Sequence, residues 1–407
     1  MISIQHENMM EDNTLLTQTW SKYPNYSVSF SNKLLKTLLH SEDVDSNIVV
    51  SPARLQAVLV LIATWASPAI RKQILNCISS GSITIEQAQT LSSSKRVEIK
   101  PCNEFKSILH EGSYPIIELN THFWIRNNLE VHRESIDQVI EDYPLFVTQV
   151  DFSDPSLKTV IDHTISEATH GLIKELNMEI QPRMLALITD ILYYKAAWDN
   201  PFTKSQTRRR IFHGTQGDTL VHMMKDTLNI PYGETPMYQM VCIPYACYVE
   251  NHVSFSMRIY LPKKKHTILD ILNAMNHRDL SVSNQEVKLS LPRFSVSSSL
   301  DGRQILTDMG LSCILDDNDI IPACIPDFKI SKVVQQVKVD VNETGTEATV
   351  VTSLGFDGCL PFEQKPKPVI MRVNKPFIFE IVEDETNTVL FAGIIHHIDP
   401  NGDTDRT

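Results

Sequence analysis

The sequence predicts an α+β protein that folds as a single domain, and three observations support this prediction. Apolar residues at helical spacing are concentrated early in the chain, whereas apolar residues that alternate with a period of two are concentrated later. Helices and strands that are segregated along a chain are typical of the α+β class. The 407 residues are 42% hydrophobic and include only 13 glycines, without repeats or Gly/Ser linkers. We therefore expect one large core rather than a string of modules.

The helical part begins with apolar residues that recur at helical spacing between Phe30 and Leu39. A short strand is expected over residues 47–50, followed by a buried helix over residues 55–63. Residues 79–104 are rich in Ser and Thr, so we expect a surface stretch around a short helix there.

The later part of the chain carries the strand patterns. Apolar and polar side chains alternate over residues 254–261, which predicts a strand with one buried face. Residues 287–291 and 337–342 alternate in the same way. Apolar runs over residues 369–382 and 388–395 predict two closing strands.

Composition excludes several classes of function. The net charge is −12, from 37 basic and 49 acidic residues, which argues against a nucleic-acid partner. No apolar run is long enough for a membrane span, so we expect no membrane partner. The seven cysteines are odd in number and form no disulfide framework. The N-terminus lacks the apolar core of a signal peptide, which predicts an intracellular protein, with the extracellular space as the alternative.

The segment 343–367 stands out as an unusually long connection between two predicted strands. Connections beyond about 12–15 residues in a compact domain are usually functional or disordered. The first half contains β-forming residues such as Val350 and Val351, whereas Gly355 and Pro361 favour an irregular second half. The first half is therefore interpreted as a strand without a fixed partner, with an ordinary long hairpin arm as the alternative.

An ordered set of motifs resembles the serpin family over residues 26–400. The stronger matches are residues 47–52, 191–198, 201–202, 333–348, 374–377 and 391–393. Further similarities are at residues 169–171, 221–224, 259–262 and 291–294. Each motif alone is weak, but their order and spacing together are specific.

The resemblance implies a serpin fold, a single domain with three β-sheets, about nine helices and an exposed reactive loop at about 343–367. Residues 1–25 would then be an N-terminal extension and residues 401–407 a C-terminal tail.

The resemblance also implies that the protein is not an enzyme but a protease inhibitor that acts as a suicide substrate. Cleavage of its loop would be followed by insertion of the loop into the main sheet and by covalent trapping of the protease. The implied partner is a serine endopeptidase, with a papain-like cysteine protease as the alternative, and we expect a monomer without a cofactor or metal. A non-inhibitory serpin that acts as a binding or chaperone-like protein is the alternative function.

The similarity assigns a hinge to the start of the loop, at Glu343, Gly345, Thr346 and Ala348. On insertion, alternate residues would face inward. This inward set is Thr346, Ala348, Val350, Thr352 and Leu354. None of them is charged, so their burial carries no large desolvation cost.

Counting from the hinge as in the family places the reactive bond between Cys359 and Leu360, with Gly358 and Phe356 as alternatives. A loop cysteine without a special role is the other interpretation of Cys359. The first basic residue after the hinge is Lys365, so a trypsin-like target is not expected.

Where serpins usually keep a buried polar cluster beneath the main sheet (the shutter), the matching residues are Ser51, Arg54, Asp190 and Gln335. We expect Arg54 and Asp190 to form a buried ion pair that controls opening of the sheet, with two unrelated surface substitutions as the alternative.

The breach, at the top of the sheet, is expected to contain Trp198 and an ion pair between Arg293 and Glu343 that pins the hinge. Residues 208–210 and 263–265 are basic runs that we interpret as solvated faces. Residues 79–104 match the family's heparin helix but are not basic, so no heparin activation is expected.

Overall fold

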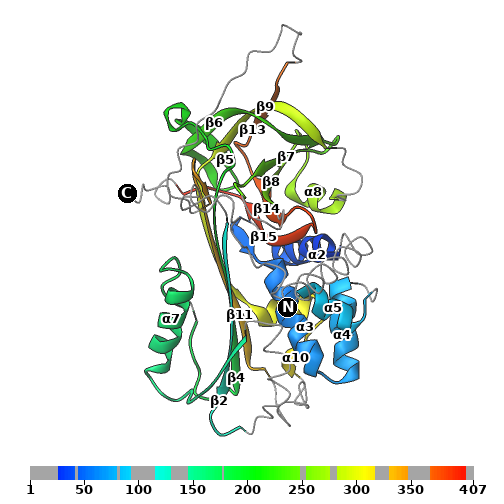
Figure 1. Ribbon diagram of the computed structural model, residues 1–407, viewed down its shortest axis with the longest axis vertical. Coiled ribbons are helices and arrows are strands. Elements are labelled where there is room, and N and C mark those ends of the chain that lie inside the picture. The colour runs from blue at the N-terminus through cyan, green and yellow to red at the C-terminus, as the bar shows by residue number, and fades with distance from the viewer. Residues whose placement is uncertain are drawn as a thin grey trace, which may run out of the picture.

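Two β-sheets organise the part of the chain that the computed structural model describes (Figure 1). The described residues are 26–41, 45–79, 83–92, 115–129, 145–176, 178–247, 254–275, 282–316, 330–346 and 367–399. The six-stranded sheet has the order β10 (Phe294–Asp301), β11 (Lys332–Val341), β12 (Gly345–Thr346), β4 (Ala186–Ala197), β2 (Ile116–Arg126) and β3 (Leu145–Val150).

The nine-stranded sheet contains the remaining described strands. Its order is β1 (Ile48–Val50), β15 (Thr388–Ile395), β14 (Phe377–Glu383), β8 (Phe255–Pro262), β7 (Tyr238–Pro244), β6 (Gly217–Glu234), β9 (Ser283–Pro292) and β13 (Val369–Arg372), and β5 (Arg208–Gly214) also pairs with β6. Three sheets were expected, but the described strands form two. The reason is that β6 is 18 residues long and pairs with β5 near one end and with β7 at the other, which makes one continuous sheet.

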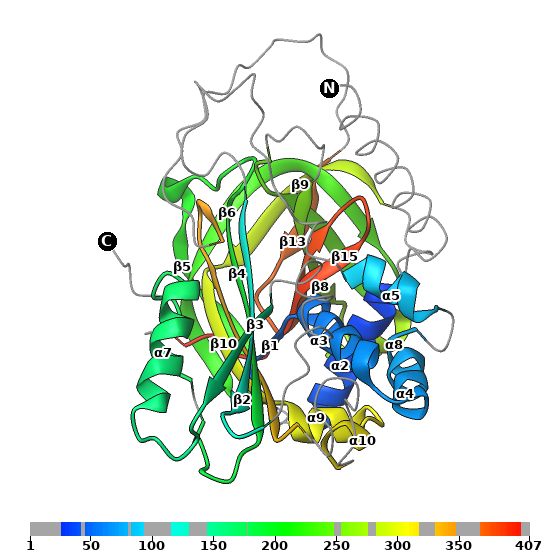
Figure 2. The same cartoon turned by 60° about the horizontal axis from the view of Figure 1, so that its bottom comes forward.

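The helices cover both faces of the six-stranded sheet (Figure 2). They are α2 (Tyr26–Ser41), α3 (Pro52–Trp65), α4 (Pro68–Ser79), α5 (Ile85–Ser92), α7 (Leu157–Ala168), α8 (Ile268–Ala274), α9 (Gly302–Asp308) and α10 (Cys313–Asp316), with a 3-10 turn at Lys204–Gln206. α7 packs on one face of the sheet through Ile161 and Ile165, and α3 packs on the other. α3 begins where predicted, because the Ser51 hydroxyl caps the backbone N–H of Arg54 and Pro52 fits the first helical turn.

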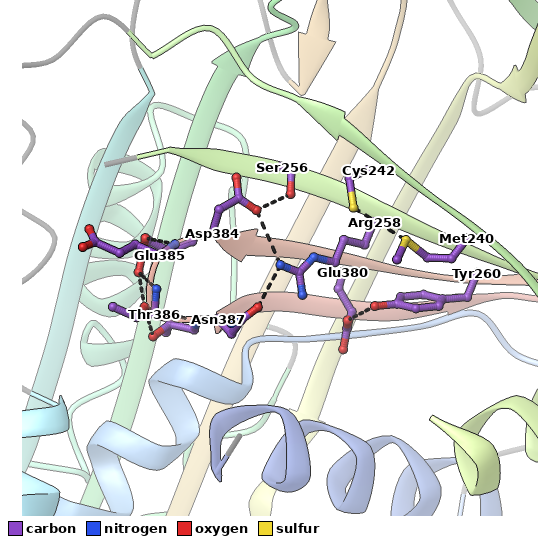
Figure 3. A network of polar contacts seen from close by, with 12 residues as sticks. Met240, Cys242, Ser256, Arg258, Tyr260, Glu380, Asp384, Glu385, Thr386 and Asn387 are labelled. Carbon is purple, nitrogen blue, oxygen red and sulfur yellow. Dashed lines mark hydrogen bonds and ion pairs between the residues drawn. The ribbon is translucent and has the colours of Figure 1, made fainter. Parts of the chain in front are cut away.

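The prediction of one buried face for the strand at 254–261 is wrong, because every residue of β8 is buried. Its polar side chains form hydrogen bonds with β14 and with the turn that follows it, in a network that is mostly buried (Figure 3). Ser256 donates to Asp384 at 2.6 Å, Arg258 donates to Asn387 at 2.9 Å, and Tyr260 donates to Glu380 at 2.9 Å. Alternation therefore marks two buried faces here, one apolar and one polar.

The single closing strand expected at 369–382 is two strands with different neighbours. β13 pairs in parallel with β9, whereas β14 pairs antiparallel with β8 and β15. The break falls at residues 373–376, where Pro376 has no N–H to contribute to a strand ladder.

His396, which directly follows β15, is buried without a hydrogen-bond partner for either ring nitrogen among the described residues. Burial lowers the pKa of this imidazole, Asp45 opposes that effect and His397 adds to it. The unfolded chain therefore takes up a proton at a higher pH than the folded chain.

We expect His396 to destabilise the folded protein as the pH falls below about 6.5 toward the lowered folded pKa of this imidazole, and to have no such effect at higher pH. Urea unfolding at pH 7.5 and 5.5 measures this dependence. His396→Phe should reduce the difference between the two pH values, whereas His163→Gln, at an exposed position, should leave it unchanged. An unchanged difference in His396→Phe would contradict this assignment.

Candidate functional site

The first residues of the long connection form a short strand inside the six-stranded sheet. Gly345 and Thr346 make up β12, which pairs antiparallel with β4 on one side and with β11 on the other. Further along, β4 and β11 pair directly and in parallel, from Lys332 opposite Leu187 to Gln336 opposite Ile191. We call this directly paired part the seam. β12 therefore lies where the two strands have already separated.

Gly345 fits this position because it has no side chain. Its φ is +154°, and a Cβ there would lie 2.1 Å from the carbonyl oxygen of Ala196. Any other residue would clash with the backbone of β4, which explains a glycine at the predicted hinge.

Trp198 and Tyr245 form hydrogen bonds with the hinge and with Asn342 just before it. The indole N–H of Trp198 donates to the carbonyl oxygen of Asn342 at 2.9 Å, and its backbone N–H donates to that of Thr344 at 2.9 Å. The Trp198 ring stacks on Tyr245 with centroids 4.6 Å apart, and the Tyr245 hydroxyl lies 2.7 Å from that of Thr346. Tyr245 was not predicted from the sequence.

The expected ion pair at the top of the sheet is present in the structure. Arg293 Nε lies 2.7 Å from Glu343 Oε2, and Thr207 donates to the other carboxylate oxygen at 2.5 Å. Burial alone would raise the pKa of Glu343, but the hydrogen bonds from Arg293 and Thr207 outweigh it and lower the pKa. The charged form of this buried carboxylate is thus stabilised, and it fixes the chain just before β12. Thr207 is a second contact that the sequence did not predict.

The residues matched to the shutter meet at the seam. Asp190 and Gln335 are direct partners across the β4–β11 pair. Arg54 lies 2.5 Å from Asp190, and Gln335 exchanges hydrogen bonds of 2.8 and 3.1 Å with the backbone of Ser51. Because Ser51 and Arg54 belong to the start of α3, one helix terminus holds both strands of the seam at the same level.

The cluster includes a residue that the sequence did not predict, Thr121 on β2. Thr121 is the cross-strand partner of Asp190 and donates to its Oδ1 at 2.9 Å, while Arg54 also contacts the Thr121 hydroxyl. Asp190 Oδ2 is buried without a hydrogen-bond partner among the described residues. The side chains of Arg54 and Asp190 are only 6% and 2% exposed, so their charges depend on each other.

Several predicted residues lie outside the part of the chain that the structure describes. They are four residues of the inward set, Ala348, Val350, Thr352 and Leu354, and the candidates for the reactive bond, Phe356, Gly358, Cys359 and Leu360. Within the described ranges, no group of three or more His, Cys, Asp or Glu side chains could hold a metal ion. No helix among those described is long and apolar enough to cross a membrane.

A sheet that admits the start of a long connection between two of its strands is the architecture expected from the serpin resemblance. The family model described as serpin (serine protease inhibitor) matches residues 25–399. The chain therefore belongs to the serpin family, a family of protease inhibitors rather than of catalytic enzymes.

Curated relatives and solved structures agree with this assignment. An uncharacterized serpin-like protein of Thermococcus kodakarensis is 30% identical over 298 residues, which cover 70% of this chain and 67% of the relative. Plasminogen activator inhibitor 1 of Bos taurus is 25% identical over 394 residues, 92% of each chain.

Two solved structures show the fold. Native tengpin, a thermophilic serpin, superposes with a TM-score of 0.77 at 20% identity and covers 93% of this chain and 94% of its own. Human thyroxine-binding globulin in its thyroxine complex has a TM-score of 0.76 at 20% identity, and the match covers 93% of this chain and 99% of the globulin chain. The predicted serpin fold is confirmed.

Proposed function

We propose that this protein inhibits an endopeptidase as a suicide substrate. The protease cleaves the loop, and the near half of the loop then inserts between β4 and β11 and draws the covalently bound protease with it. The observation that carries this proposal is the position of β12. Its two residues already lie between β4 and β11 and pair with both, at the end where an inserted strand would begin. Strand addition, of which serpin loop insertion is a known example, pairs the backbone of the added strand with both of its neighbours. We call the position between β4 and β11 that the loop would occupy the slot.

The register of β12 sets how far the loop would extend. Thr346 pairs with Ala196 of β4 and with Val341 of β11, and both pairings are antiparallel. Each residue after Thr346 would therefore pair with the residue one position earlier on β4 and one position earlier on β11. Phe356 would then reach Ala186, where β4 begins, and Gly355 would reach Lys332, where β11 begins. A reactive bond at Cys359–Leu360 would leave enough loop to fill the slot, with the protease just beyond its far end. This register is compatible with Cys359 and with Phe356 as the bait residue.

Both sides of the slot give the same position for Thr352. Counted along β4 from Thr346 it would come opposite Asp190, and counted along β11 it would come opposite Gln335. A threonine there is uncharged, and its hydroxyl would lie beside Asp190, whose Oδ2 has no partner in the described part of the chain. The loop sequence is thus chemically compatible with the seam that it would enter.

The target class follows from the loop residues. With Cys359 as the bait, and no basic residue before Lys365, the loop suits a protease with a small or medium apolar specificity pocket. We propose a serine endopeptidase of that kind, with a papain-like cysteine protease as the alternative. The similarity to a thyroxine-binding serpin supports a second candidate, a non-inhibitory binding protein.

Incubation with an elastase-type serine protease and with a cathepsin-type cysteine protease should give a complex that survives a denaturing gel. Mass spectrometry of the released C-terminal fragment should place the cleaved bond after Cys359. A cleaved monomer without any complex, for every protease that cuts the loop, would overturn the inhibitory function and favour the binding protein.

A matched pair of loop variants tests insertion. Val350→Arg would bury a charge on insertion and should convert the inhibitor into a substrate, with complex formation reduced at least about tenfold. Glu347→Arg places an arginine on the outward face, opposite the partly exposed Lys195 and Asp340, and should retain complex formation. Equal behaviour of the two variants would contradict the proposed register.

A further inference from the structure

A basic groove lies on the nine-stranded sheet, beside the strand that follows the loop. It has a volume of about 390 Å³ and is formed by β7, the end of β8 with the turn after it, and β13 with its continuation. Its cationic lining residues are Lys263, Lys264, Arg372 and Lys375. β13 is labelled next to β9 in the upper part of Figure 1.

The cations of the groove have few acidic partners. Lys263 pairs with Glu234 at 2.9 Å, but no ion pair joins Lys264, Arg372 or Lys375 to a carboxylate within the described ranges. Burial lowers the pKa of Lys375, and the charge of Lys264 lowers it further. The chain has a net charge of −12, yet these cations lie together in one groove. Because like charges repel, a bound anion would stabilise them.

The sheet register extends this positive surface. Ile370 is paired with Lys288 and Arg372 with Ser290, so the exposed face of β13 continues onto β9. Ser290 is in turn paired with Lys225 on β6. Glu286, two residues before Lys288, is the acidic residue on this strand, and it leaves the balance positive.

The groove is also lined by apolar side chains. These are Leu261, Pro262 and Ile370, of which Ile370 is 56% exposed. The guanidinium of Arg372 adds a planar pair of donors that matches phosphate and sulfate oxygens.

We propose that this groove binds a compact anion with several phosphate or sulfate ester groups. The basic run at 263–265 was expected to be a solvated face, but the fold joins it to Arg372 and Lys375, which are more than a hundred residues away in the sequence. This inference is independent of the proposed inhibitory function.

Calorimetric titration of the full chain with sucrose octasulfate and with inositol hexakisphosphate tests the proposal. At about 50 mM salt, we expect saturable binding of one molecule per chain, weakened at about 150 mM salt. The probe that binds more tightly identifies sulfate or phosphate esters as the natural chemistry.

Charge-reversal variants give the matched control. Lys264→Glu with Arg372→Glu should weaken binding at least about tenfold. Lys174→Glu with Arg183→Glu changes the net charge equally in the connection from α7 to β4, and should change affinity less than about twofold. Absence of saturable binding by both probes, or equal weakening in the two double variants, would overturn the proposal.

The pH dependence of octasulfate binding gives a second readout, because the sulfate esters do not titrate. A bound anion favours protonated Lys375, so affinity should fall as the pH rises through the lowered pKa of Lys375. Lys375→Arg keeps the charge over this range and should bind with a smaller fall. An equal fall in the wild type and in Lys375→Arg would exclude Lys375 from the site.

Discussion

Cleavage of the loop near Cys359 should raise the thermal unfolding midpoint of the protein by about 10 °C or more. The reason is that residues 346–356 would become a strand paired on both sides along β4 and β11. Insertion breaks the direct pairing of the seam but forms hydrogen bonds on both sides of the new strand, and each bond gained in excess contributes about 0.5–1.5 kcal/mol net. Differential scanning fluorimetry of intact and cleaved protein measures the shift.

The same loop variants that test complex formation control this experiment. Cleaved Val350→Arg should show a much smaller rise in midpoint, because its charge would be buried. Cleaved Glu347→Arg should show the same rise in midpoint as the cleaved wild type. A cleaved wild-type protein whose midpoint does not rise would rule out insertion and therefore the inhibitory mechanism.

Arg54→Ser should lower the free energy of unfolding by about 3–5 kcal/mol, or convert the protein into polymers. The substitution leaves the carboxylate of Asp190 buried without its cation, and the seam then loses one of its two attachments to α3. Urea unfolding measures the loss of stability, and size-exclusion chromatography after mild heating measures polymerisation.

Two comparisons make this prediction specific. The double variant Arg54→Leu, Asp190→Leu removes both charges and should be more stable than Arg54→Ser. Lys158→Ser breaks a more exposed ion pair with Asp162 on α7 and should cost less than about 1 kcal/mol. An Arg54→Ser protein as stable as the wild type would show that the ion pair does not hold the seam.

The order of motifs along the chain was sufficient to predict the fold, because serpin strands and helices occur at recognisable spacing. It also identified residues that the structure brings into contact, such as Arg54 with Asp190 and Arg293 with Glu343. These pairs were predicted because their charged residues stand at positions that match the shutter and the breach of the serpin family.

The contacts that were missed have a common physical origin. Thr121 and Tyr245 are placed by pairing across a sheet, and no local pattern marks a threonine or tyrosine as the partner of a distant side chain. The second buried face of β8 was missed for the same reason, because its polar residues are satisfied by residues more than a hundred positions away. Local periodicity reports which residues share a face, but not what covers that face.

The attachment of both seam strands to the start of α3 also has a kinetic consequence. In the proposed mechanism, loop insertion would compete with hydrolysis of the acyl bond, and Asp190 would have to separate from Gln335 before Thr352 could pass. A stronger attachment at Arg54 would then give the protease time to hydrolyse the bond and escape. A weaker attachment would let the seam open before any protease arrives. Under that mechanism, the strength of the Arg54–Asp190 ion pair would set the rate of insertion relative to hydrolysis.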